Sequence, residues 1–156
     1  MTENKNIQKY ESYKAMHENL SKAMKNGFFY EAIFIEYAIL EDRFSSVLRH
    51  AGIPYMNNKG RDVAITEKIK RIRNSKELSG KFYKDRLTEK LLDELVGWLG
   101  ERNDLIHHLA KLPYDSESVK HTAETGYELV MTVQKKSASV IRHLNRVNNP
   151  ALKCQA

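Results

Sequence analysis

The sequence predicts an all-α protein, a helical bundle of four long helices plus one short helix. Only seven Gly and three Pro interrupt 156 residues, which is too few for the dense turns of a β-sandwich or barrel. Residues that favour helices, among them Glu, Lys, Leu and Ala, are plentiful. Apolar residues also recur every three or four positions over long segments, as they do on one buried face of a helix.

The first two predicted helices differ in the apolar surface that they offer. The first covers about residues 7–25, has little apolar content and ends at Asn26 and Gly27, a common helix-ending pair. The second covers about residues 28–49 and ends before Ile53 and Pro54. It is the clearest core helix, because its apolar residues follow one stripe at about 100° per residue. This stripe consists of Phe29, Ile33, Tyr37, Leu40, Phe44 and Val47.

In the second half of the chain, the sequence predicts one short helix and two long helices. After a loop at residues 55–61, a short basic helix begins near Ile65 and breaks at residues 74–80. A long helix over about residues 83–112 follows, and Asp115 or Ser116 caps a last helix that runs to about residue 148. The expected buried residues are Ile65, Ile69 and Ile72, then Leu87, Leu91, Leu92, Leu95, Val96, Leu99, Leu105 and Leu109, and finally Val119, Val130, Val133, Val140, Ile141, Leu144 and Val147.

Length and composition fit a single domain over residues 1–156, with flexible tails at residues 1–6 and 149–156. The 41% of hydrophobic residues suffices for a core. The N-terminus is polar and no stretch approaches the roughly 20 apolar residues of a membrane span, so we expect a cytoplasmic protein without membrane contact. The only cysteine, Cys154, excludes an internal disulfide, which fits a reducing compartment.

Positive charge is concentrated in one stretch of the chain. Residues 59–90 hold 11 Lys or Arg against five Asp or Glu, so this stretch equals the net charge of +6 of the whole chain. Such a concentration favours a polyanionic partner, although a solvated basic helix face has the same pattern. The candidate phosphate-binding residues are Lys68, Lys70, Arg71 and Arg73.

Polar residues crowd onto the predicted long helix between residues 100 and 109. Arg102 falls near the centre of the apolar stripe, where a guanidinium is costly unless it is paired. Asn103 and His107 are four residues apart and therefore share a face of the helix. Arg102 and His107 point about 140° apart, and a symmetric dimer that brings two such helices together is the simplest way for them to converge.

Arg102, Asn103 and His107 resemble the Arg-x4–6-His motif of the HEPN superfamily, in the variant with Asn directly after Arg. The resemblance implies a compact helical bundle that dimerises so that two motifs face each other across a cleft. Many members are metal-independent endoribonucleases of toxin–antitoxin, antiphage or RNA-processing systems. For this chain it implies that Arg102, His107 and Asn103 are catalytic, with RNA as substrate, a homodimer, an antitoxin-like protein as a further partner, and no cofactor.

The residue types suit cleavage of RNA through its own 2′-hydroxyl. That reaction needs a base, an acid for the leaving 5′-oxygen, and positive charge at the phosphate. Histidine suits proton transfer, as expected of His107, and the planar fork of Arg102 suits phosphate oxygens. Asn103 would orient His107 or hold a phosphate oxygen. The basic stretch would then supply nonspecific affinity for RNA.

Glu36 is a second polar residue on an apolar stripe, because it lies between Ile33 and Leu40 on the second predicted helix. The resemblance implies a supporting acidic residue on an early helix, with Arg102 or His107 as the contact of Glu36. A purely structural ion pair of Glu36 with Arg102 or Arg43 is equally compatible with the pattern.

Two other functions fit the sequence. A non-catalytic HEPN-like module would bind RNA, a nucleotide or a protein partner, and a plain helical scaffold would contain a buried pair of Arg102 and Glu36. His108 is more typical of a surface histidine than of a site residue. The six histidines include no HExxH pair and no two that are four residues apart, so no metal site is predicted.

Overall fold

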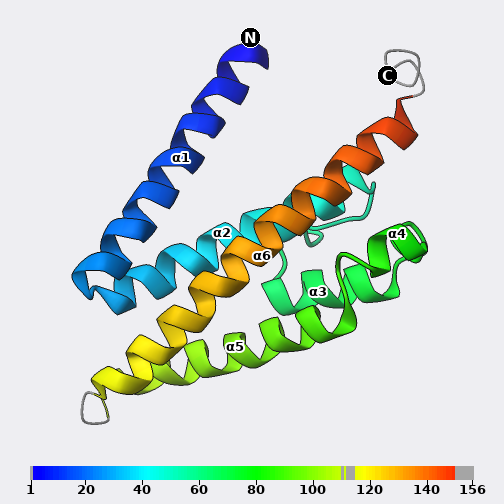
Figure 1. The fold of residues 1–156 in the computed structure, drawn as a ribbon. Coiled ribbons are helices and arrows are strands. Elements are labelled where there is room, and N and C mark those ends of the chain that lie inside the picture. Colours follow the sequence, from blue (N-terminus) through cyan, green and yellow to red (C-terminus); the bar gives the residue numbers. More distant parts are fainter. Residues whose placement is uncertain (1, 110, 112–114, 150–156) are drawn as a thin grey trace.

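The computed structural model describes residues 2–109, 111 and 115–149, and these residues form the predicted all-α bundle (Figure 1). Over these ranges the chain forms six helices and no strand, with one isolated bridge between Met56 and Asp62. None of these helices is both long and apolar enough to cross a membrane. The helices are α1 (Thr2–Asn26), α2 (Phe29–His50), α3 (Ile65–Asn74), α4 (Lys81–Lys84), α5 (Glu89–His108) and α6 (Ser116–Asn148).

Helices α2 and α6 form the centre of the bundle and make its most extensive packing contact. Helix α1 packs on α2, α5 packs on α6, and α3 packs on α2 and α5. Helix α1 contacts α2 and α6 from Lys9 onward, since Lys9 pairs with Asp42, Arg43 lies over the Tyr13 ring, and His17 bonds to Gln134. The core lies between α2, α5 and α6, and buried residues of α1 and α3 extend it. It covers one face of α5 and leaves the opposite face accessible.

Helix α2 confirms the predicted core helix to within one residue at each end. Ile33, Leu40, Phe44 and Val47 are fully buried, as the apolar stripe predicts. The stripe turns α2 toward α6, because a helix buries its apolar face against its neighbour.

The turn between α1 and α2 is built on Gly27, as the sequence predicts. Gly27 has a φ of +75°, a left-handed conformation that glycine adopts without steric cost. The backbone N–H of Phe28 donates to the carbonyl of Ala23 at 2.9 Å and closes the helix end. The predicted start of α1 at residue 7 is wrong, because α1 already begins at Thr2. Residues 2–6 therefore continue the helix and do not form the predicted tail.

The predicted long helix over residues 83–112 begins too early. Residues 81–84 form the separate helix α4, and α5 begins at Glu89, where the side chain of Thr88 accepts a hydrogen bond from the N–H of Leu91. The cause of the break is the docking of α4 on α6. The ring of Phe82 stacks on His143 with centroids 4.0 Å apart, and Arg86 Nε donates to Ser139 Oγ at 2.8 Å.

At the other end, α5 ends at His108, and the predicted end at residue 112 lies outside the described residues. Three residues of the predicted core are exposed instead of buried, because they lie at a helix end or on an outer face: Val96, Leu109 and Val147.

Helix α6 begins where the sequence predicts. The side chain of Asp115 accepts hydrogen bonds from the N–H groups of Glu117 and Ser118, so Asp115 is the N-cap. The helix runs to Asn148, also as predicted. Of the predicted C-terminal tail, only Asn149 lies among the described residues, and its N–H donates to the carbonyl of Asn145.

Candidate functional site

The three motif residues lie on the C-terminal half of α5. Arg102 is half-buried, and its guanidinium carbon lies 4.4 Å from the ring centroid of Tyr37 and 5.7 Å from that of Phe34, both on α2. Its Nη1 donates to Asn103 Oδ1 at 3.0 Å. The aromatic ring and the neighbouring amide thus fix the guanidinium at the edge of the bundle instead of at the centre of the core.

The charge of Arg102 is not neutralised within the described part of the chain, where it forms no ion pair with a carboxylate and its buried Nε has no hydrogen-bond partner. Other arginines differ in this respect. Arg43 pairs with Asp42 at 2.6 Å and Arg71 with Glu67 at 3.1 Å. Arg102 therefore keeps a positive charge that is available to an anionic ligand.

Asn103 and His107 are both exposed, one helical turn apart on the outer side of α5. The Asn103 side-chain oxygen is engaged by Arg102, and no hydrogen bond joins Asn103 to His107 among the described contacts. Val96 and Gly100 precede them at helical spacing, so the four residues form one exposed stripe, which we call the outer stripe of α5: Val96, Gly100, Asn103 and His107. A single chain does not bring Arg102 and His107 together.

Glu36 is fully buried, as the sequence predicts, but its predicted partners are wrong. Among the described residues, neither carboxyl oxygen of Glu36 has a hydrogen-bond partner, and no ion pair joins it to Arg102, His107 or Arg43. The reason is that α2 turns Glu36 toward α6, where Gly126 leaves room: a β-carbon built at Gly126 would lie 2.1 Å from Glu36 Oε2. Burial raises the pKa of Glu36 to about 8, so the group is mostly neutral at pH 7.

The predicted phosphate-binding residues are placed very differently from one another. Lys68 is fully buried, and its Nζ contacts Asp62 at 2.7 Å and Glu41 at 3.4 Å, so its prediction as a surface contact to RNA is wrong. Lys70 is exposed. The other two residues are engaged: Arg71 with Glu67 and the carbonyl of Pro54, and Arg73 with Glu89 and Asp93.

A helical pattern already contains the signal for the burial of Lys68. Lys68 lies three residues after Ile65 and four before Ile72, on the face that α3 buries. A count of basic residues ignores this face, whereas the position of each residue on the helix reveals it. The positive surface of the stretch is consequently smaller than its composition suggests.

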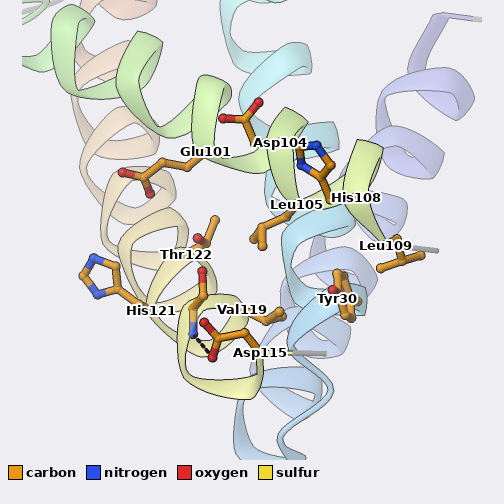
Figure 2. A pocket seen from close by; sticks show the side chains of 11 residues that line it. Tyr30, Glu101, Asp104, Leu105, His108, Leu109, Asp115, Val119, His121 and Thr122 are labelled. Atoms are coloured by element: carbon orange, nitrogen blue, oxygen red, sulfur yellow. Dashed lines mark hydrogen bonds between the residues drawn. The ribbon is translucent and has the colours of Figure 1, made fainter. Parts of the chain in front are cut away.

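A cavity of about 490 Å³ lies where the end of α5 meets the start of α6, and sequence reasoning did not predict it (Figure 2). Its lining from α5 follows the spacing of one helix face, with Glu101, Asp104, Leu105 and His108. This face differs from that of Asn103 and His107, so none of the three motif residues lines the cavity. His121 and Thr122 line it from α6, and Tyr30 lines it from α2.

The His and acidic residues at this cavity do not gather into a metal site. Within the described ranges, no group of three or more His, Cys, Asp or Glu residues is arranged so that it could hold a metal ion. The chemistry that the motif offers is therefore that of Arg102, Asn103 and His107 themselves.

Comparisons of the chain with protein-family models, with curated proteins and with solved structures gave no significant match.

Proposed function

We propose that this protein is a metal-independent endoribonuclease of the HEPN type, which acts in the cytoplasm as a homodimer within a toxin–antitoxin or antiphage system. The observation that carries the proposal is the state of Arg102. The side chain is half-buried, its guanidinium contacts Tyr37 and Asn103, and it has no carboxylate partner among the described residues. A positioned guanidinium without a carboxylate partner suits the oxygens of a phosphate diester.

In the proposed reaction, His107 accepts the proton of a ribose 2′-hydroxyl and the 2′-oxygen attacks the adjacent phosphorus. The bond from phosphorus to the 5′-oxygen breaks, and that oxygen takes a proton from the second His107 of the dimer. The products are a 2′,3′-cyclic phosphate and a 5′-hydroxyl. Arg102 neutralises the charge that develops on the phosphate oxygens.

The outer stripe of α5 supports a dimer as part of this proposal. Arg102 and His107 point about 140° apart on one helix, so they reach the same phosphate only across a two-fold axis. Val96 is 41% exposed, and a β-carbon at Gly100 would meet no atom within 4 Å. A second α5 can therefore approach closely at Gly100, which brings the two copies of the motif to one interface.

Incubation of the purified protein with single-stranded RNA or DNA in EDTA tests the activity. The parent should cleave RNA and leave DNA intact, because DNA lacks the 2′-hydroxyl. His107→Ala should remove cleavage without changing helicity, since His107 is exposed. His108→Ala is the matched control, because His108 is the next residue, is equally exposed and lies on another face. Equal cleavage by His107→Ala and the parent would refute the proposal.

Light scattering tests the dimer. Val96→Asp should yield a monomer that no longer cleaves RNA, because a charge on the outer stripe opposes association of two copies. A parent that is monomeric at tens of micromolar would separate Arg102 from His107. That result would favour the second candidate, a non-catalytic HEPN-like module that binds RNA, a nucleotide or a protein partner.

A further inference from the structure

Phe34 is a large apolar side chain that remains 50% exposed on α2, next to Arg102 of the motif. We infer that Phe34 is the stacking surface for the nucleobase adjacent to the phosphate that Arg102 binds. The inference rests on the proposed function and adds to it a contact to the substrate: an unpaired base of single-stranded RNA. Sequence reasoning did not single out Phe34.

The contacts of Arg102 define the position of this surface. Phe34 and Tyr37 are three residues apart, so both rings lie on the side of α2 that faces Arg102. The guanidinium carbon is 4.4 Å from the Tyr37 ring but 5.7 Å from the Phe34 ring. Tyr37 is thus the ring that holds Arg102, and Phe34 lies at the outer limit of a cation–π contact.

Phe34 therefore has no complete structural role in the described part of the chain. Its neighbours on the core face of α2, such as Ile33 and Ile39, are fully buried, whereas half of Phe34 remains in contact with solvent. An exposed aromatic ring next to an unneutralised cation has the two features that recognise one nucleotide. The cation binds the phosphate, and the ring stacks on the base.

This pairing favours RNA over a protein as the occupant. A protein would need two side chains here, an apolar one on Phe34 and a carboxylate on Arg102, whereas a single nucleotide supplies both a base and a phosphate. Stacking also tolerates every base, because each has a π-face, so the subsite should select unpaired bases with little preference among them. Paired RNA should bind less well, since its bases are stacked within the duplex.

Binding measurements on the His107→Ala protein test the inference without interference from cleavage. Anisotropy of a short labelled single-stranded RNA should show that Phe34→Ala binds on the order of 10-fold more weakly, while Phe34→Trp retains the affinity. Phe28→Ala is the matched control, because Phe28 precedes α2, is 58% exposed and lies about 1.7 helical turns from Phe34. Its affinity should equal that of the parent.

A double-mutant cycle with abasic RNA separates stacking from a general structural effect. One base of the RNA is removed at a time. At one position, loss of the base should weaken binding about 10-fold for the protein that keeps Phe34 and should have no effect for the protein with Phe34→Ala. A structural role of Phe34 would lower the affinity equally at every position. The absence of coupling at all positions would overturn the inference.

The inference and the proposed function fail in different ways. If the parent cleaves RNA in EDTA but Phe34→Ala binds and cleaves normally, the stacking surface is refuted and the nuclease stands. If the parent never cleaves but the coupling to one base persists, the nuclease is refuted and the stacking surface stands. If Phe34→Ala changes only the oligomeric state by light scattering, Phe34 belongs to a protein interface and the inference is overturned.

Discussion

Gly126 on α6 lies directly against the carboxyl group of Glu36 on α2. A β-carbon at position 126 would lie 2.1 Å from Glu36 Oε2 and 2.8 Å from Trp98 Cζ2. Because Glu36 is fully buried and Trp98 is 1% exposed, neither side chain can move into solvent to make room. The missing side chain at position 126 thus allows α2 and α6 to pack closely around Glu36.

Gly126→Ala should therefore destabilise the protein. Overpacking in a closed core costs about 1–3 kcal/mol, which exceeds the gain of about 1 kcal/mol in helix propensity. Gly97→Ala is the matched control, since Gly97 is exposed in α5 and an added β-carbon would meet no atom within 4 Å. That variant should become more stable by up to about 1 kcal/mol. Urea denaturation measures the stability of both variants. Equal stabilisation by Gly126→Ala and Gly97→Ala would contradict the close packing of α2 and α6 at Gly126.

The stability should depend on pH through Glu36. Burial raises its pKa from 4.5 to about 8, so between these values the folded state keeps a proton that the unfolded state has released. The free energy of unfolding should therefore fall as the pH rises through this window, by up to about 1.4 kcal/mol per pH unit from this group. The protonated Glu36 carboxyl group makes its full favourable contribution to stability below pH 4.5, and this contribution is lost above about pH 8.

Glu36→Gln isolates this effect, because glutamine has nearly the same shape and does not titrate. Its advantage in stability over the parent should grow from about pH 5 to about pH 8. His17, whose pKa is lowered mainly by burial, titrates in both proteins and cancels in the difference. Parallel stability curves for the parent and Glu36→Gln in this range would refute the prediction.

Arg102→Ala should abolish RNA cleavage at little cost in stability. Its guanidinium stacks on Tyr37 and leaves no buried carboxylate behind when it is removed, so we expect a loss of about 1 kcal/mol. Loss of a partner of a buried ion pair would cost about 3–5 kcal/mol. Arg102→Lys should fold normally but cleave poorly, because an ammonium lacks the planar fork. Thermal melting measures the stability of both variants, and an RNA cleavage assay measures their activity. A loss of stability above about 3 kcal/mol for Arg102→Ala would indicate a buried ion pair.

Lys68 and Lys70 should respond in opposite ways to replacement. Lys68→Ala removes a fully buried ammonium from Asp62 and Glu41 and should destabilise the fold by about 1–3 kcal/mol. Lys70→Ala should change stability by less than about 0.5 kcal/mol. If Lys70 contacts RNA phosphate, its loss should reduce the salt slope of RNA binding by about 0.7. Denaturation measures the stability of the two variants, and RNA binding at several salt concentrations measures the salt slope. An unchanged salt slope for Lys70→Ala would show that Lys70 does not contact RNA.

Much of the helix layout could be predicted because its signals are local. Gly27 ends α1 and Asp115 begins α6, and each acts through its own backbone or side chain. The break between α4 and α5 has one local signal, because Thr88 caps α5. The placement of α4 against α6 could not be predicted in this way, since it involves contacts of Phe82 and Arg86 with residues far away in the sequence. Helical periodicity continues across such a break, because it records which face is apolar and not where the chain bends.

At the candidate site, the burial of Glu36 could be predicted from the sequence, whereas its neighbours could not. The apolar stripe of α2 predicted that Glu36 is buried, and this is confirmed. Its surroundings depend on the register between α2 and α6, which brings Gly126 to Glu36 and is not encoded in either helix alone. The roles of Arg102, Asn103 and His107 in cleavage stay predictions, as does the dimer that would unite them.

Trp98 is the only tryptophan of the chain, and its indole borders the same point of the core as the Glu36 carboxyl group. Its Nε1 donates to the carbonyl of Thr122 on α6 at 2.8 Å, so the indole has a fixed place at the junction of α5 and α6. Ionisation of Glu36 places a negative charge beside this chromophore, so the emission of Trp98 should change with a midpoint at about pH 8. The fluorescence of Trp98 should thus report whether Glu36 is charged.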